Sequence, residues 1–251
     1  MGRRSLAAVI ALICTFAGAS PASAVQPLIV GGAAADQVYP FNVSLQSASG
    51  EHVCGGTLVK PVWVVTAAHC VQGREPTTLT VRIGSNSLVE GGEVGTAAEL
   101  VVHPDYNPSG AGGDIALVKL AAPAQAAPLP IGSSAVPGTP TRLLGWGQTC
   151  PEKNCGPRSE VLQQLDTKVV DGAGCTAEFD GTVELCTDNP GGTAGSCYGD
   201  SGGPELVRLE ETWRLVGVTS RPGNKNPTCA TSPSIYTSAI AYQPWLDQMT
   251  S

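Results

Sequence analysis

Short apolar and β-branched runs recur along the chain at regular intervals, and they constrain the fold more than any other feature. Six lie in the first half: Phe41–Leu45, His52–Val59, Trp63–Ala67, Leu79–Ile83, Ala98–His103 and Asp114–Leu120. Six more follow: Thr141–Gly145, Val161–Val170, Val183–Cys186, Glu205–Leu209, Trp213–Thr219 and Ser234–Thr237. Turn residues separate the runs, so the pattern predicts an all-β barrel or sandwich. A Pro- and Ala-rich connector at 121–131 divides the two sets, and only residues 241–250 are predicted to be helical.

The N-terminus has the features of an export signal. Arg3 and Arg4 precede an apolar run, and a small-residue cleavage motif ends at Ala24. The run is too short to cross a bilayer comfortably, which argues against a membrane anchor. We therefore expect residues 1–24 to be a signal peptide and the mature protein to be secreted and extracellular. The two arginines do not decide whether export uses the Sec route or the twin-arginine route.

Cysteine content and charge narrow the class of protein further. Eight cysteines lie outside the signal: Cys54, Cys70, Cys150, Cys155, Cys175, Cys186, Cys197 and Cys229. An even count in an exported chain predicts four disulfides, although the count alone leaves their pairing open. No pair has zinc-ligand spacing with histidine support, so no metal site is expected. The net charge of −7 argues against nucleic-acid and anionic-membrane partners.

The hexapeptide Gly199-Asp200-Ser201-Gly202-Gly203-Pro204 is the strongest candidate for a chemical site. Glycines permit backbone conformations with positive φ and let other atoms approach closely. A serine held among them would be exposed beside free N–H groups, which are a nucleophile and donors for an oxyanion. The alternative is a tight turn between strands, since all these residues favour turns.

Two further residues could complete such a site. His69 ends an apolar strand next to Cys70, and a disulfide there would fix a general base in place. Asp114 leads into a buried-looking strand, where a carboxylate needs a partner such as an imidazole N–H. Taken singly, each has a plain alternative: a surface histidine at a strand end, or an aspartate that begins a strand.

The order of the motifs resembles that of the trypsin/chymotrypsin-like serine proteases. The matching segments are Ile29–Gly32, Cys54–Gly56, Thr66–Cys70, Asp114–Leu117, Gly145–Gly147 and Gly199–Pro204. The resemblance covers residues 29–251. It implies two six-stranded antiparallel β-barrels packed face to face, at about 29–125 and 126–240, with a C-terminal helix. The Ala- and Gly-rich composition and the short leader are typical of a bacterial secreted member.

By this resemblance the chain is a serine endopeptidase with three catalytic side chains. Ser201 would be the nucleophile, His69 the general base and acid, and Asp114 the carboxylate that orients His69. The backbone N–H groups of Gly199 and Ser201 would form the oxyanion hole.

Three other residues compete for these roles. The resemblance implies a core position for His52 and a surface turn for His103. Asp105 rivals Asp114, but it lies in a turn and lacks the strand that follows Asp114.

The resemblance also implies activation by proteolysis. A cut before Ile29 would free an α-amino group that pairs with Asp200 and orders the oxyanion hole. Residues 25–28 would then be a short propeptide. The cut would follow Leu28 and not a basic residue, so trypsin would not make it, whereas self-activation is a hypothesis.

Three residues are expected to shape the primary specificity pocket: Gly195, Ser220 and Ser234. Trypsin-like members have Asp where this chain has Gly195. A basic substrate side chain would be desolvated without a partner there, so we expect a neutral, chymotrypsin- or elastase-like preference for apolar residues. Next to Ser220, Arg221-Pro222 replaces the usual Trp-Gly, and Pro222 lacks an N–H for the substrate backbone. Residues 221–227 are expected to form a loop.

The resemblance implies three disulfides, Cys54–Cys70, Cys175–Cys186 and Cys197–Cys229. The two remaining cysteines, Cys150 and Cys155, would then close a short local loop. Ser85-Asn86-Ser87 stand where related calcium loops carry acidic residues, so no calcium site and no cofactor are expected.

Two other functions remain as alternatives. A catalytically silent homologue could serve as a secreted binding module, although such proteins usually lack one of the three catalytic side chains. An α/β-hydrolase esterase would need the chain order Ser, Asp, His and many helices, and this chain has neither. The expected partners are protein or peptide substrates and protein inhibitors, and the expected state is a monomer.

Overall fold

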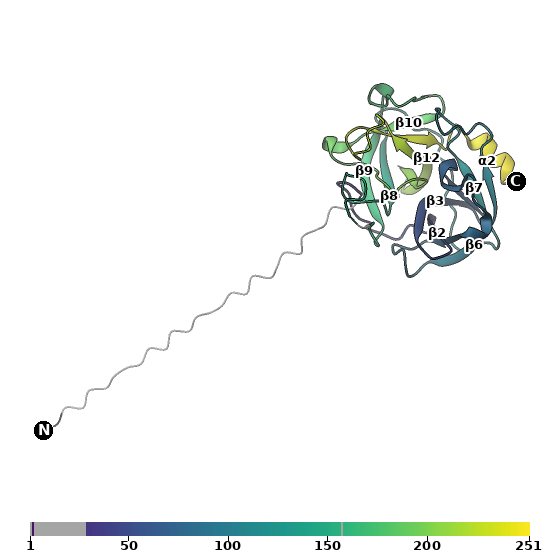
Figure 1. The fold of residues 1–251 in the computed structure, drawn as a ribbon, viewed down its shortest axis with the longest axis horizontal. Coiled ribbons are helices and arrows are strands. Elements are labelled where there is room, and N and C mark those ends of the chain that lie inside the picture. The colour runs from purple at the N-terminus through teal and green to yellow at the C-terminus, as the bar shows by residue number, and fades with distance from the viewer. Residues whose placement is uncertain (1, 3–28, 157) are drawn as a thin grey trace.

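The computed structural model describes residue 2, residues 29–156 and residues 158–251. The predicted signal peptide (1–24) and propeptide (25–28) lie outside the described residues, apart from residue 2. Within the described part of the chain, no helix is long and apolar enough to cross a membrane. Figure 1 shows the purple and blue strands of the first half beside the green and yellow strands of the second.

The first half closes into a six-stranded antiparallel barrel. Its strands are β2 (Asn42–Ser47), β3 (His52–Lys60), β4 (Trp63–Thr66), β5 (Leu79–Ile83), β6 (Glu93–Val102) and β7 (Ala116–Leu120). They are hydrogen-bonded in the order β2-β3-β4-β7-β6-β5, and β5 returns to β2 to close the barrel. Side chains that alternate along β5 fill the interior, as the period of two requires.

The second half forms another closed barrel. Its strands are β8 (Pro140–Gly145), β9 (Gln163–Val170), β10 (Glu184–Thr187), β11 (Pro204–Leu209), β12 (Thr212–Pro222) and β13 (Ser234–Ser238). They run in the order β9-β10-β13-β12-β11-β8, and β8 pairs with β9 to complete the ring. The predicted fold of two six-stranded antiparallel barrels is therefore confirmed.

The N-terminal segment differs from the expected division into halves. The short strand β1 (Ala33–Ala34) pairs with β9, and Val30 forms a bridge with Gly195. Residues 29–34 therefore pack on the second barrel, although they were expected to belong to the first. Ile29 packs into the core of the second barrel, and β1 adds to its sheet beside β9. The chain then crosses to β2 of the first barrel.

In the part of the chain that the structure describes, helices are few and short. They are α1 (Ala68–Val71), α2 (Gln243–Met249) and three single 3₁₀ turns at Pro76–Thr78, Gly172–Gly174 and Pro190–Gly192. The predicted C-terminal helix is α2, with Pro244 in its first turn, where a missing N–H costs little. Tyr242 and Trp245 pack edge-on against His103 of the first barrel. The C-terminus of the second half therefore fastens the two barrels together.

Candidate active site

His69 lies in the single helical turn α1, directly after β4. The preceding Ala67 is extended, so the chain turns sharply as it leaves the barrel. The disulfide between Cys70 and Cys54 joins this turn to β3, with their Cα atoms 6.2 Å apart. The imidazole is thus fixed at the rim of the first barrel, and 32% of its side-chain surface remains exposed. A rigid but accessible ring meets the requirements of a general base.

Asp114 holds His69 through two hydrogen bonds. The Nδ1–H of His69 donates to Oδ2 of Asp114 at 2.8 Å, and the backbone N–H of His69 donates to Oδ1 at 3.0 Å. Burial by itself would raise the pKa of Asp114, but the bonds and charge of His69, with a bond from Ser220, hold that pKa below its usual value. The carboxylate therefore stays ionised and accepts Nδ1–H, so Nε2 is the nitrogen of the neutral ring that can accept a proton.

Ser220 reaches the same carboxylate from the second barrel. Its hydroxyl donates to Oδ2 of Asp114 at 2.6 Å. A β-bulge produces this geometry: Thr219 pairs with Tyr236 and Arg221 pairs with Ile235, so Ser220 is the extra residue between them. Bulges redirect a side chain in this way. The sequence predicted Ser220 only as a pocket residue, because no local signal shows where a bulge will aim a hydroxyl.

The turn that carries Ser201 rests on the strands that lead to His69. The backbone N–H of Gly55 donates to the carbonyl of Ser201 at 2.7 Å. Gly202 has φ of 76°, and a Cβ there would collide with Thr66 and Gly55. Only glycine fits both constraints. The turn therefore packs closely enough to bring Ser201 and the His69 segment to one junction between the barrels.

Two backbone donors beside Ser201 are available to a ligand. Among the residues that the structure describes, neither the N–H of Gly199 nor that of Ser201 donates a hydrogen bond. Gly199 has φ of 104°, and its carbonyl accepts a bond from Nε2 of His52 at 2.8 Å. Since a carbonyl only accepts, that nitrogen carries the proton, and Nδ1 accepts from Ser44 at 2.8 Å. Burial lowers the pKa of His52 to about 4, so a neutral His52 steadies Gly199.

Asp200 is buried beneath this turn. Its two carboxylate oxygens accept bonds from the N–H groups of Gly147 and Cys197, both at 2.8 Å. Burial raises its pKa to about 6, although the two N–H bonds and the charge of Arg158 act in the opposite direction. Ile29 is also buried, with φ of 38°, and its nitrogen is a peptide amide in the intact chain. Asp200 therefore has hydrogen bonds but no described ion-pair partner.

A cavity of about 230 Å³ opens beside Ser201. Its wall includes Ser220 and Ser234 as predicted, and the hydroxyl of Ser196 donates to that of Ser234 at 3.1 Å. No aspartate or glutamate is among the described residues that line it: Ser196, Cys197, Tyr198, Ser201, Thr219, Ser220, Arg221, Pro222, Asn226, Pro227, Thr228, Cys229, Ala230, Ser232 and Ser234.

Gly195 differs from its expected place in this cavity. It does not line the wall, and a Cβ on it would lie 3.6 Å from Cα of Ala230. Its N–H instead donates to the carbonyl of Val30 at 2.9 Å. Gly195 is therefore held beside two lining residues, Ala230 and Ser234, whereas Ser196, Cys197 and Tyr198, which follow it, line the cavity themselves.

The structure also places the remaining candidate residues, which are His103, Asp105, Arg221 and Pro222. His103 begins a turn as expected, since its carbonyl accepts from the N–H of Tyr106 at 3.1 Å, but its side chain is buried and not at the surface, because the rings of Tyr242 and Trp245 cover it. Asp105 has no contact with His69, and its N–H donates to His103. Arg221 and Pro222 end strand β12 and do not begin a loop as expected.

All four expected disulfides are present. They join Cys54 to Cys70, Cys150 to Cys155, Cys175 to Cys186 and Cys197 to Cys229. His69 and the first pair form the one described cluster with metal-ligand spacing. Both sulfurs there are bonded to each other, so neither is a thiolate that could bind a metal.

Comparisons with known proteins agree with this geometry. The family model described as Trypsin matches residues 29–246. A trypsin of Saccharopolyspora erythraea is 34% identical over 229 residues, which cover 85% of this chain and 94% of that protein. Chymotrypsin-like elastase family member 1 of Bos taurus is 35% identical over 87% of this chain and 88% of its own length. A trypsin of Xenopus laevis is 33% identical over 94% of this chain and 96% of its own. The chain therefore belongs to the trypsin family and is a serine endopeptidase.

Proposed function

We propose that Ser201, His69 and Asp114 hydrolyse peptide bonds through an acyl-enzyme. Ser201 Oγ attacks the substrate carbonyl while Nε2 of His69 accepts its proton. The imidazolium then protonates the leaving amine, and water releases the acyl group by the same two steps. The observation that carries this proposal is the pair of bonds from His69 to Asp114, because they fix the ring and direct Nδ1–H to the carboxylate, which leaves Nε2 as the basic nitrogen.

The oxyanion of the tetrahedral intermediate would bind to the N–H groups of Gly199 and Ser201. Neither donates to another described residue, so both can donate to substrate without breaking an existing bond. Loss of one such donor typically reduces the rate by about 10²- to 10³-fold. His52 supports this role because its bond to the carbonyl of Gly199 fixes the orientation of that residue's backbone.

The cavity beside Ser201 is the proposed primary specificity pocket. Its described lining offers hydroxyls, apolar atoms and the cation of Arg221 but no carboxylate, which disfavours a desolvated Arg or Lys side chain. Pro222 and Ser234 pair across β12 and β13 at the cavity wall, and their side chains narrow it. We therefore assign a preference for medium-sized apolar residues such as Leu or Met.

Pro222 has a second effect on substrate binding. An extended peptide that pairs with the end of β12 would find no N–H at this position. One missing hydrogen bond weakens peptide binding by about 0.5–1.5 kcal/mol, without touching the chemical step.

Activation is proposed to follow a cut after Leu28. The freed ammonium of Ile29 would pair with Asp200, whose buried carboxylate has no described cationic partner within ion-pair distance. Leu28 fits the proposed pocket, so the enzyme could activate itself. An S201A variant made in a host without other proteases tests this, since processing at Leu28 would then have to come from elsewhere.

We also propose that the mature enzyme acts outside the cell on protein or peptide substrates. The four disulfides support this placement because they persist in oxidising compartments. Protein inhibitors are proposed partners, and a monomer is the proposed state.

A cleavage profile tests the function. Protein that begins at Ile29 is given a diverse peptide library, with S201A as the blank, and the cut sites are read by mass spectrometry. Cuts after Leu, Met, Phe or Tyr support the neutral pocket, whereas cuts after Arg or Lys contradict it. An absence of Ser201-dependent cuts would favour a silent binding module instead.

A further inference from the structure

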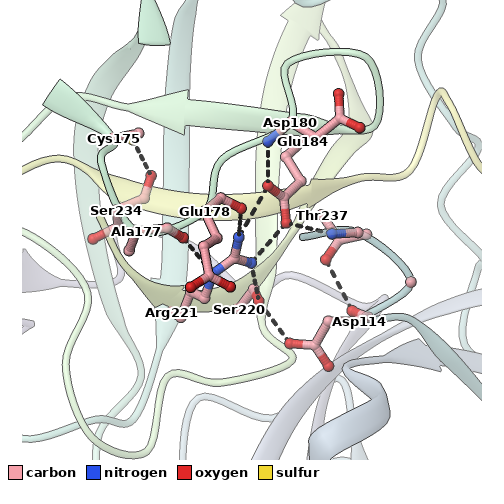
Figure 2. A network of polar contacts seen from close by, with 12 residues as sticks. Asp114, Cys175, Ala177, Glu178, Asp180, Glu184, Ser220, Arg221, Ser234 and Thr237 are labelled. Atoms are coloured by element: carbon pink, nitrogen blue, oxygen red, sulfur yellow. Dashed lines mark hydrogen bonds and ion pairs between the residues drawn. The ribbon is translucent and has the colours of Figure 1, made fainter. Parts of the chain in front are cut away.

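A buried ion pair lies next to the proposed catalytic carboxylate. Arg221 Nη1 is 2.6 Å from Oε1 of Glu184, and Nη2 is 3.0 Å from Oε2, so the two side chains meet as a two-pronged pair. The Glu184 side chain is fully buried, and that of Arg221 is 24% exposed. Figure 2 shows this pair between β12 and the segment that leads to Asp114. A charge pair placed in the interior is costly to desolvate, and, although Arg221 lines the proposed pocket, this pair has no part in the chemical steps described above.

The pair holds Asp114 from two directions. Oε1 of Glu184 accepts the N–H of Gly112, two residues before Asp114, at 2.9 Å. Arg221 Nη1 donates to Oγ of Ser220 at 3.3 Å, and Ser220 donates to Asp114 at 2.6 Å. One branch thus fixes the backbone that carries the carboxylate, and the other reaches the carboxylate itself. Figure 2 shows the second branch as dashed lines from Arg221 to Ser220 and from Ser220 to Asp114.

The chemistry of these groups sets the direction of the second branch. A guanidinium only donates and a carboxylate only accepts. The single O–H of Ser220 must therefore point to Asp114, while its lone pair accepts from Arg221. Arg221 thus selects the hydroxyl orientation that supports Asp114.

The guanidinium is fully engaged in this arrangement. Besides the bonds to Glu184 and Ser220, its Nε donates to the carbonyl of Ala177 at 3.3 Å, and its Nη2 donates to that of Glu178 at 2.9 Å. These bonds account for all five N–H donors of an arginine. A lysine would keep the charge but could not reproduce this planar fork.

We propose that Arg221 and Glu184 are positioning residues for Asp114, a role that rests on the proposed function of Asp114. The pair keeps Ser220 donating to the carboxylate and keeps the loop at Gly112 in place. It also balances charge: either partner alone would place an uncompensated charge near the His69–Asp114 couple. The charged and titratable groups around the couple and the ion pair are Asp105, Tyr106, Glu178, Asp180, Glu184, Arg221, Lys225 and Tyr242.

Two substitutions separate the hydrogen bonds from the charge. E184Q keeps the shape and leaves the positive charge of Arg221 uncompensated, which disfavours the imidazolium of His69. We expect the acidic midpoint of the kcat/KM pH profile to fall by about 0.5 pH unit. R221K keeps the charge and loses the fork. We expect kcat to fall about threefold to tenfold with KM and the midpoint nearly unchanged.

K225M is the matched control. Lys225 pairs with Glu178 on the same surface at 2.7 Å, but both side chains are largely exposed. Its loss should leave kcat and the midpoint unchanged, because exposed pairs contribute little.

All rates are expressed per active site, counted by fluorophosphonate labelling of Ser201. One outcome is that the variants have fewer labelled active sites while each remaining site keeps the wild-type kcat and the wild-type pH midpoint. In that case the pair is merely structural and the inference fails. An NMR titration of His69 in the S201A background gives a second readout, and an unshifted E184Q curve there also refutes the inference. Absence of Ser201-dependent activity in the wild type would overturn the proposed function as well.

Discussion

The hydroxyl of Ser220 donates a 2.6 Å hydrogen bond to Oδ2 of Asp114, across the junction between the two barrels. The same oxygen accepts from His69, so one carboxylate atom joins a residue of each barrel. The relative placement of the barrels therefore contributes directly to the lowered pKa of the proposed catalytic carboxylate.

The S220A variant should lower activity without abolishing it. Asp114 would lose a hydrogen bond to its charged form, worth about 1.5–3 kcal/mol, and its pKa would rise. We expect kcat to fall about tenfold with KM nearly unchanged, measured with a peptide that has Leu directly before the cleaved bond. S232A is the control, because Ser232 lines the same cavity but bonds only to the carbonyl of Pro233. Equal losses in both variants would contradict the role of Ser220.

A carboxylate in the cavity should reverse its charge preference. S234D would place an acid on the wall that Ser196 now contacts. We expect the ratio of kcat/KM for Arg over Leu substrates to rise at least about tenfold, because a basic side chain then has a partner. The ratio is measured with paired peptides that differ only in that residue. G195D is a parallel test, since a Cβ at Gly195 would lie 3.7 Å from Cβ of Ala230 and 4.0 Å from Oγ of Ser234, both of which line the cavity, so an acid there should raise the ratio too. An unchanged ratio in S234D would place the pocket elsewhere.

Glu205 makes the fold sensitive to pH near neutrality. It is fully buried in the second barrel, where Thr141 and Thr187 donate to it at 2.8 and 2.9 Å. Burial raises its pKa to about 7 from 4.5, against the effect of the two threonines. A group with a raised folded pKa stabilises fully below its unfolded pKa, and this contribution is lost as pH rises through the folded pKa. We expect the free energy of unfolding to decline by about 3 kcal/mol between pH 4.5 and 7.

The E205Q variant isolates this effect. The amide oxygen can still accept from a threonine but cannot ionise, so the decline over this pH range should be much smaller. Urea unfolding at a series of pH values measures it, in the S201A background to prevent self-digestion. E90Q, at an exposed position, should retain the full decline. If E205Q and the parent decline equally, Glu205 does not titrate in this range.

Asp200 should respond to cleavage before Ile29. In the intact chain its pKa is raised to about 6 by burial, so its stabilising contribution is present below pH 3.8 and lost as pH rises through about 6. A paired Ile29 ammonium would lower that pKa and remove this loss. We expect S201A protein that begins at Ile29 to have a higher Tm than the intact S201A chain at pH 7, and a smaller difference at pH 4. D200N should abolish this difference in Tm. If the difference persists in D200N, a group other than Asp200 causes it.

The sequence by itself determined most of the strands and the identity of the main candidates. Each of the twelve apolar runs corresponds to a strand, because alternation and turn residues report burial and backbone preference locally. The motifs around His69, Asp114 and Ser201 were equally local. Boundaries were less certain: β6 begins at Glu93, five residues before the predicted run, in a stretch with little apolar character.

Only the tertiary structure decided how distant residues meet. The bulge that aims Ser220 at Asp114 depends on the pairing of β12 with β13. The position of Gly195 depends on its bridge to Val30, and the partner of Arg221 lies in another strand. These contacts join residues far apart in the chain, where no local pattern specifies direction or distance. They are set by the packing of the two barrels, which positions the side chains that the sequence could only name.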